Sequence, residues 1–384
     1  MLNTEIETAL ALYFIKPLPH AKLSKLLASI GPPSQIIAAQ AIALRGAGLQ
    51  DEQIHAIDGC QSDSEVQRQV TLSLEWLQES SHHHLVLLTD SHYPPLLREI
   101  HDPPPLLFVV GQIEALLLPQ IAMIGSRRCS VDGKSNAKRF SGFLAEQHFC
   151  ICSGMARGID TCAHEAALAA GGATVAVLGT GVDVIYPKSN GVLAQQISGK
   201  GALISELPLG SKAIASHFPK RNRIISGMSA GVIVVEAALR SGSLITARLA
   251  LEHNRELFAI PSSIRNPLAV GCHRLIQQGA ALIDAPEQVL EQLDSLLGSQ
   301  FTLLQQTRSN EPVQESRLAA LSPEASGVIR AMGYDPVSLD IIVERSKLPL
   351  ASVQTHLLRL ELDGHVCNHL GRYVLSDARD LKGD

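Results

Sequence analysis

Six basic side chains lie in or beside loops that follow apolar runs, and such a pattern suits phosphate binding. Residues 121–127 are IAMIGSR, 175–190 are VAVLGTGVDVIYPKSN, and 217–227 are HFPKRNRIISG. The basic residues are Arg127, Arg128, Lys188, Lys220, Arg221 and Arg223. Backbone amides backed by guanidinium and ammonium groups hold phosphate well, and these loops contain few carboxylates. The sequence therefore predicts a site for a polyanion.

The loop GSRRCS at residues 125–130 places two arginines after a glycine. It matches neither the GxGxxG fingerprint nor a Walker A loop, because arginine stands at its third position and the Walker lysine pattern is absent. The loop is either a tight turn with two solvated arginines or a phosphate cradle in which Arg127 makes a bidentate contact. Taken alone, this motif is weak.

The segment SGMARGIDTCAHEAAL at residues 153–168 also begins at the end of an apolar run. Its loop from Gly154 to Gly158 could contact phosphate. Asp160, His164 and Glu165 could suggest a metal or acid–base site. We favour the simpler interpretation that Asp160 caps a helix, since no further Cys, His or Asp spacing completes a metal set.

The loop at residues 179–190 offers both flexibility and charge. Gly179 and Gly181 would let a ligand approach the backbone closely, and Lys188 supplies a positive charge. The alternative is that Lys188 is a solvated lysine in a surface turn.

Residues 217–227 form the densest basic cluster. Arg221 and Arg223 would diverge in a helix, so we expect one to face the ligand and the other to form an internal salt bridge. Farther along, Glu236 is either a catalytic base or a buried carboxylate paired with one of these arginines. Residues 241–243, which are Ser-Gly-Ser, place hydroxyl groups and amides at a helix start, which suits an anion.

These loops together supply the predicted phosphate-binding residues. They are Gly125, Ser126, Arg127, Arg128, Gly154, Gly179, Gly181, Lys188, Lys220, Arg221, Asn222, Arg223, Ser241, Gly242 and Ser243. The sequence has no nucleophile elbow with a Ser-His-Asp order, no Walker lysine and no carboxylate cluster for Mg²⁺. We therefore expect no catalytic residues, no metal site and no cofactor.

Strands and helices alternate from residue 121 onward, and this alternation must position the loops. We predict strands near 121–125, 149–153, 173–178, 202–205, 232–236, 256–260 and 281–283. We predict helices near 132–147, 160–171, 189–199, 216–229, 243–254, 271–278 and 286–297. Repeated β-α units of this length indicate an α/β fold with a Rossmann-like, doubly wound sheet. The proline-punctuated residues 85–111 extend that sheet with two strands.

The flanking segments have other patterns, which give four predicted parts. Residues 1–80 lack strand alternation and resemble a small helical domain of the sterile-alpha-motif or helix-hairpin-helix kind, with an interaction or structural role favoured over DNA binding. Residues 85–298 form the extended Rossmann-like domain, and the polar residues 299–316 a linker. Residues 317–384 have a winged-helix pattern, but their second helix, within residues 350–363, holds one arginine against two acids. We therefore expect it to contact protein or pack internally.

Charge is distributed unevenly along the 384 residues. Residues 1–118 carry 6 Lys and Arg against 13 Asp and Glu, residues 119–298 carry 17 against 13, and residues 299–384 carry 9 against 11. Only the middle segment is net positive, so it is the segment suited to nucleic acid. Seven cysteines without CxxC pairs or zinc spacing indicate reduced thiols, and the first twenty residues fit neither a secretory signal nor a membrane span. We expect a soluble, cytoplasmic protein without membrane contacts.

Seven motifs in order resemble the DNA-processing protein A family (DprA, also called Smf). They are GSRRCS, SGMARGIDTCAHEAAL, GTGVDVIYPKSN, HFPKRNRIISG, EAALRSGSLITA, FAIPSSI and GCHRLIQQGA, over roughly residues 90–298. The resemblance implies a non-enzymatic single-stranded DNA binder with an extended Rossmann fold. It also implies protection of incoming DNA and loading of the RecA recombinase during natural transformation, with homodimerisation through the Rossmann domain. The family's DNA-contacting arginine and lysine fall on Arg127 and Lys188.

Single-stranded DNA binding also needs rings on which bases stack, and aromatic residues make up only 4% of the chain. The candidates are Phe140, Phe143, Tyr186 and Phe218, some of which must belong to the core.

Two other classes of function stay open. One is a nucleoside-phosphate hydrolase of the lysine-decarboxylase-like group, with Glu236 as base, although residues 240–246 are RSGSLIT where such enzymes carry PGGxGT. The other is a nucleotide-dependent regulator that reads DNA through its winged helix.

Overall fold

The structure is a computed structural model, and the chain in it forms two compact units, Met1–Leu297 and Gly298–Asp384, each with a hydrophobic core of its own. The predicted linker at 299–316 lies outside the described residues. Across the described part of the chain, no helix is long and apolar enough to cross a bilayer. The described residues are 2–293, 323–332, 337–362, 366–369 and 372–375.

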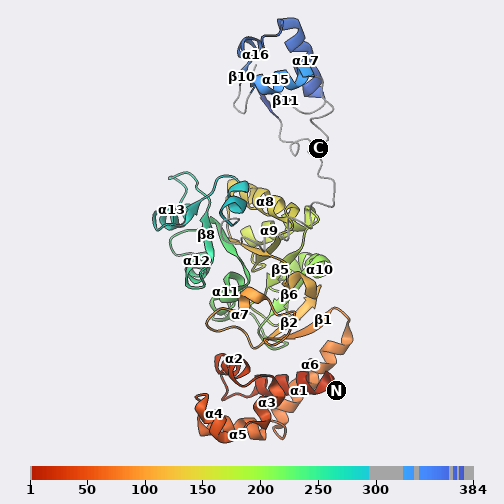
Figure 1. Cartoon of the computed structure of the whole chain (residues 1–384), viewed down its shortest axis with the longest axis vertical. Coiled ribbons are helices and arrows are strands. Elements are labelled where there is room, and N and C mark those ends of the chain that lie inside the picture. Colours follow the sequence, from red (N-terminus) through yellow and green to blue (C-terminus); the bar gives the residue numbers. More distant parts are fainter. Residues whose placement is uncertain (1, 294–322, 333–336, 363–365, 370–371, 376–384) are drawn as a thin grey trace. The chain divides into compact units, whose positions relative to one another are not determined.

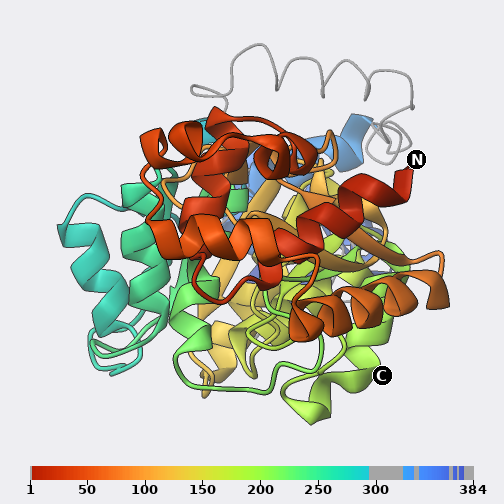
Figure 2. The ribbon, with the colours of Figure 1, turned by 90° about the horizontal axis from the view of Figure 1, so that it is seen from below.

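The first unit begins with six helices, as the helical spacing of its apolar residues predicted, and they lie together in Figure 2. They are α1 (Leu2–Phe14), α2 (His20–Ser29), α3 (Pro33–Ala38), α4 (Ala41–Gly46), α5 (Asp51–Gly59) and α6 (Ser64–Glu79). The carboxylate of Asp63 caps α6 by accepting from the amides of Glu65 and Val66.

These helices share one hydrophobic core with the sheet that follows. The buried ring of Phe108 lies with its centroid 6.0 Å from that of Tyr13 and 5.9 Å from that of Trp76, so an aromatic cluster joins α1 and α6 to the second strand. The domain boundary near residue 80 stays a prediction, because this core is continuous across it.

The sheet has nine strands in the order β1-β2-β6-β5-β4-β3-β7-β8-β9. They are β1 (His83–Leu87), β2 (Leu106–Gly111), β3 (Gln120–Gly125), β4 (Cys150–Ser153), β5 (Thr174–Val177), β6 (Ala202–Ser205), β7 (Gly231–Glu236), β8 (Glu256–Ala259) and β9 (Ala281–Leu282). Strands β3 to β9 pair in parallel, whereas β2 pairs antiparallel with both β1 and β6. The predicted strands and the extension by residues 85–111 are confirmed.

Helices cover both faces of this sheet (Figure 1). One set, α8 (Val131–Glu146), α9 (Ile159–Ala169) and α10 (Gly191–Lys200), follows β3, β4 and β5. The other set, α11 (His217–Met228), α12 (Ser243–Glu252) and α13 (Val270–Gln277), follows β6, β7 and β8. Right-handed crossovers place the two sets on opposite faces, because the strand order runs one way from β3 and the other way from β7. The α/β prediction is confirmed, with its topological switch point between β3 and β7.

The second unit is a winged helix. Its described elements are α15 (Pro323–Met332), β10 (Val337–Ser338), α16 (Leu339–Ser346), α17 (Leu350–Leu362), β11 (Val366–His369) and β12 (Arg372–Leu375). The strands pair in the order β10-β12-β11. Lys347 adopts φ 57° at the turn between α16 and α17. Buried Val328, Ile342, Val353 and Leu357 form the core, which confirms the pattern predicted for the two helices and the two strands after them.

Candidate functional site

A cleft of about 850 Å³ opens at the carboxyl ends of β3 and β7, where the strand order reverses. Open α/β sheets bind ligands in the crevice at this point. Nine of the predicted residues line the cleft, and they come from the end of β3 and the loop after it, from α11, and from the residues at and just before the start of α12. They are Gly125, Ser126, Arg127, Arg128, Arg221, Asn222, Ser241, Gly242 and Ser243.

Glu236 anchors the loop after β3. Its carboxylate, 2% exposed, accepts from the Ser130 amide at 2.9 Å, from the Ser130 hydroxyl, and from the Asn266 side-chain amide at 3.4 Å. Ser130 Oγ in turn accepts from the Gly133 amide and so caps α8. The expected burial of Glu236 is confirmed, but the expected pairing with an arginine was wrong, because its described partners are Ser130 and Asn266. A carboxylate engaged in this way is poorly placed to act as a base.

The same loop is fixed from its other side by the loop before α9. Gly158 has φ +84°, and a Cβ on it would lie 2.3 Å from the carbonyl oxygen of Ser126, so only glycine fits. The Ile159 amide donates to that same oxygen at 3.2 Å. Gly158 occupies the N-cap position of α9, so the predicted capping role of Asp160 was wrong. Asp160 lies in the first turn, where its carboxylate accepts from the Ala156 amide at 3.2 Å.

Arg221 and Arg223 diverge on α11 as predicted. Arg223 forms the internal salt bridges, with Nε 2.9 Å from Asp102 Oδ2 and Nη2 2.5 Å from Glu206 Oε2. Arg221 faces the cleft, but it is only 5% exposed, and its Nη1 donates to the carbonyls of Gly154 and Val177. Arg221 therefore ties the ends of β4 and β5 together beneath the cleft.

Burial shifts the charged groups beneath the cleft. It raises the pKa of the Asp160 carboxyl to about 6, a rise that the nearby Arg221 guanidinium opposes. It also lowers the pKa of the Arg221 guanidinium to about 10. Fully buried His164 has its pKa lowered to about 3, and its Nδ1 lies 2.6 Å from Thr174 Oγ1, which makes it a neutral core residue. Within the described ranges, no group of three or more His, Cys, Asp and Glu side chains could hold a metal.

Aromatic rings and guanidinium groups meet on one wall of the cleft. The Phe218 ring centroid lies 5.7 Å from Cζ of Arg127 and 5.9 Å from Cζ of Arg221. The Tyr186 ring centroid is 5.7 Å from that of Phe218, and Tyr186 is 46% exposed. Of the four candidate platforms, these two line the cleft, whereas Phe140 is 1% exposed in the core.

Three predicted glycines contribute to the site in another way than expected. A Cβ on Gly179 would lie 2.8 Å from the Phe218 ring, and one on Gly154 would lie 2.5 Å from the Arg221 guanidinium. A Cβ on Gly181 would meet Asp183 at 2.5 Å. Protein atoms thus fill the space that we expected a ligand to use. Gly179 and Gly154 let Phe218 and Arg221, respectively, pack close to the backbone.

The other predicted cations lie off the cleft. Lys188 is exposed at the start of a 3-10 helix (Lys188–Asn190), while Lys220 and Arg223 line a second groove beside α1 and α2. Conversely, Arg240 lines the cleft and was missed. Its position just before Ser241, after an apolar strand, was the signal that could have identified it.

Family models match two parts of the chain. The model for DNA recombination-mediator protein A covers residues 84–294, and a DprA winged helix domain model covers residues 312–372.

Relatives extend this match over most of the sequence. Protein Smf of Escherichia coli is 43% identical over 308 residues, which are 80% of this chain and 81% of the relative. DNA processing protein DprA of Streptococcus pneumoniae is 49% identical over 207 residues, which are 54% of this chain and 73% of the relative.

Two solved structures are similar. The X-ray structure of DprA from S. pneumoniae has a TM-score of 0.64 and 36% identity, covering 74% of this chain and 97% of that chain. A structure of DNA processing protein A from Helicobacter pylori, described as giving insight into its single-stranded DNA binding mode, has a TM-score of 0.50 and 31% identity, covering 56% and 97%.

Proposed function

This chain belongs to the DNA recombination-mediator protein A family, and on that premise we propose that it binds single-stranded DNA in the cleft at the switch point. The observation that carries the proposal is the meeting of Arg127 with Phe218 and Tyr186 on one wall of the cleft. Single-stranded DNA binders combine cations for the phosphates with rings on which bases stack. The single-stranded DNA binding mode described for the H. pylori relative supports the same ligand here.

The rings also favour single strands over duplex. Bases in a duplex are stacked on one another, so a protein ring reaches them only after costly unstacking. In a single strand, each base stacked on a ring contributes about 1–3 kcal/mol. We expect duplex DNA to bind the same phosphate contacts weakly, without this gain.

Membership of the family supports a proposal for the biological role. We propose that the protein acts in the cytoplasm during natural transformation, protects incoming single strands and loads the RecA recombinase onto them, as a homodimer through the Rossmann domain. A direct check is the rate at which RecA hydrolyses ATP on single strands coated with a single-strand-binding protein. Addition of this protein should shorten the lag, and Arg127→Glu should restore it. An unchanged lag with wild-type protein would contradict the loading role.

We propose further that the protein is not an enzyme. The carboxylate of Glu236, which a hydrolase of the lysine-decarboxylase-like group would use as base, is engaged by Ser130 and Asn266.

Mobility shifts with matched single- and double-stranded oligonucleotides, beside a nucleotide hydrolysis assay, test both proposals. We expect a shift with single strands and no turnover. Turnover that is lost in Glu236→Gln but kept in Arg127→Glu would favour the hydrolase instead.

A further inference from the structure

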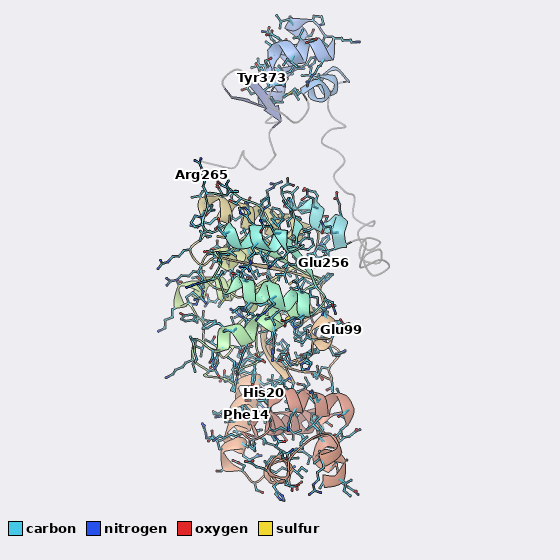
Figure 3. The ribbon with its side chains drawn as sticks, turned by 90° about the vertical axis from the view of Figure 1, so that its left-hand side faces the viewer. Phe14, His20, Glu99, Glu256, Arg265 and Tyr373 are labelled. Atoms are coloured by element: carbon cyan, nitrogen blue, oxygen red, sulfur yellow. The ribbon has the colours of Figure 1, made fainter. Side chains whose placement is uncertain are left out.

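A second groove, of about 790 Å³, lies in the same unit between the turn joining α1 to α2 and the helix α11. Phe14, Lys16 and His20 line it from the helical region, and Glu206 lines it from the loop after β6. Figure 3 shows Phe14 and His20 close to one another where the helical region meets the rest of the unit. The function proposed above does not involve this groove.

Helix α11 separates the two openings and contributes to both. Phe218, Arg221, Asn222 and Ile225 line the cleft at the switch point, whereas His217, Lys220 and Arg223 line the second groove. The two sets have helical spacing, and therefore belong to two faces of one helix. An α-helix with its side chains is about 10–12 Å wide, so a chain molecule needs to cross only that width to reach from one opening to the other.

Each acidic residue of the second groove contacts an arginine, but two of them share one. Asp102 and Glu206 both contact Arg223, and Glu65 contacts Arg68 at 2.8 Å.

Lys16 and Lys220 are exposed in the groove, and neither has an ion-pair partner within 4.0 Å among the described residues. With Arg68 and Arg223 counted beside these two lysines, four cations face the three carboxylates Glu65, Asp102 and Glu206, which leaves one net positive charge, although residues 1–118 as a whole are acidic.

The groove also presents rings beside these lysines. The His20 ring stacks on Tyr13 with centroids 4.2 Å apart and planes 24° apart, and half-buried Phe14 lies with its centroid 5.0 Å from that of Tyr13. Burial lowers the pKa of His20, which leaves its ring neutral at pH 7. The groove thus repeats, in a smaller form, the combination of cations and rings found in the first cleft.

We propose that a single strand of DNA held in the cleft at the switch point crosses α11 and enters this second groove, where Lys16 and Lys220 neutralise phosphates. The inference rests on the proposed single-stranded DNA binding and adds the helical region to the binding path. It also assigns Lys220 to the far side of α11 from Arg127.

Strand length separates the two openings in an experiment with the full chain. An oligonucleotide of about 6 nucleotides fits one opening, whereas one of about 20 nucleotides reaches both. Lys16→Glu should weaken binding of the long strand about fivefold and leave the short strand within twofold of wild type. The control Lys25→Glu, which reverses an exposed lysine on α2 outside both openings, should change neither.

Salt dependence gives a second readout on the long strand. Each lost phosphate contact lowers the log–log slope by about 0.7, so Lys16→Glu/Lys220→Glu should lower it by about 1.4. The neutral pair Lys16→Gln/Lys220→Gln should give the same slope change, which guards against misfolding of the charge-reversed protein. The control is Lys25→Glu/Lys200→Glu.

Two results would overturn the inference: unchanged long-strand affinity and slope in these variants, or equal losses for both strand lengths. The proposed function fails separately if Arg127→Glu leaves binding of the short strand intact.

Discussion

Two regions of this chain have a fold that is used elsewhere to bind nucleic acid, and they differ in charge. The cleft at the switch point gathers Arg127, Arg128 and Arg240 in a segment with 17 basic residues against 13 acidic ones. Helix α17 occupies the place of a recognition helix in the winged-helix unit, but Arg359 is its one arginine, and Leu358 on it is 60% exposed.

This contrast in charge shows that the fold of a motif does not by itself identify its ligand. Phosphate contacts supply much of the affinity for nucleic acid, so a helix with a single arginine gains little from binding in a DNA groove. Burial of an exposed leucine side chain against another apolar surface, by contrast, lowers the free energy. We therefore propose DNA binding for the cleft and expect a protein contact for α17.

Reversing the charge of Arg127 should have the largest effect. In Arg127→Glu, we expect single-stranded DNA affinity to fall about a hundredfold, because a charge-assisted contact of about 1.5–3 kcal/mol is lost and repulsion is added. The log–log salt slope should fall by about 0.7. Fluorescence anisotropy across a salt series measures both.

The matched control is Arg248→Glu, which alters an exposed arginine that pairs with Glu252 on α12. Equal losses in the two variants would mean that net charge, and not the cleft, sets the affinity. Lys188→Glu should also weaken binding, by less than Arg127→Glu, since Lys188 lies off the cleft wall.

Removing the Phe218 ring should have the next largest effect. Phe218→Ala should weaken single-strand binding about tenfold, within the 1–3 kcal/mol expected for a stacked base. The salt slope should stay unchanged, because no phosphate contact is lost. Phe143→Ala, on α8 outside the cleft, is the control in the same titration. If Phe218→Ala instead lowers the salt slope, the Phe218 ring acts by positioning Arg127 for its phosphate contact.

The buried Asp160 should make stability depend on pH. Its folded-state pKa is raised from 3.8 to about 6, so its contribution to stability is present below pH 3.8 and is lost as the pH rises through 6. At pH 7, Asp160→Asn should be more stable by about 1 kcal/mol, since lost attraction to Arg221 offsets part of the removed desolvation. The gain should shrink as the pH falls toward 4. Urea unfolding at several pH values measures the difference in free energy of unfolding between Asp160→Asn and the wild type. A difference that stays constant with pH would contradict this prediction.

The smallest effect is expected in the winged helix. Arg359→Glu should change single-strand affinity less than twofold, because one cation on α17 adds little to binding that the cleft provides. A tenfold loss in the same anisotropy assay would place DNA on α17 and remove the contrast between the two regions.

The sequence predicted the fold class and most element positions because its apolar runs are strong and regularly spaced. Runs such as 121–125 and 232–236 belong to central parallel strands that are buried on both faces, which makes them continuous in the sequence. It also predicted that Arg221 and Arg223 diverge, since helical geometry depends on spacing alone.

The sequence could not predict which atoms fill the space beside a glycine. Gly179 and Gly154 indicated a close approach, but whether a ligand or Phe218 and Arg221 would take that space depends on tertiary packing. The partners of Glu236 could not be predicted either, because Ser130 and Asn266 lie 106 and 30 residues away along the chain. Side-chain contacts between distant segments leave no periodic signal.

The most direct test of the central claim compares the full chain with residues 1–297, the compact unit that contains the cleft and its own hydrophobic core. Single-stranded DNA affinity of the two proteins is measured by anisotropy at the same moderate salt, with circular dichroism to verify folding. We expect dissociation constants within about threefold of each other, and an affinity about a hundredfold lower in both proteins when Arg127→Glu is introduced. A folded 1–297 protein that binds no single-stranded DNA would contradict the assignment of DNA binding to the cleft.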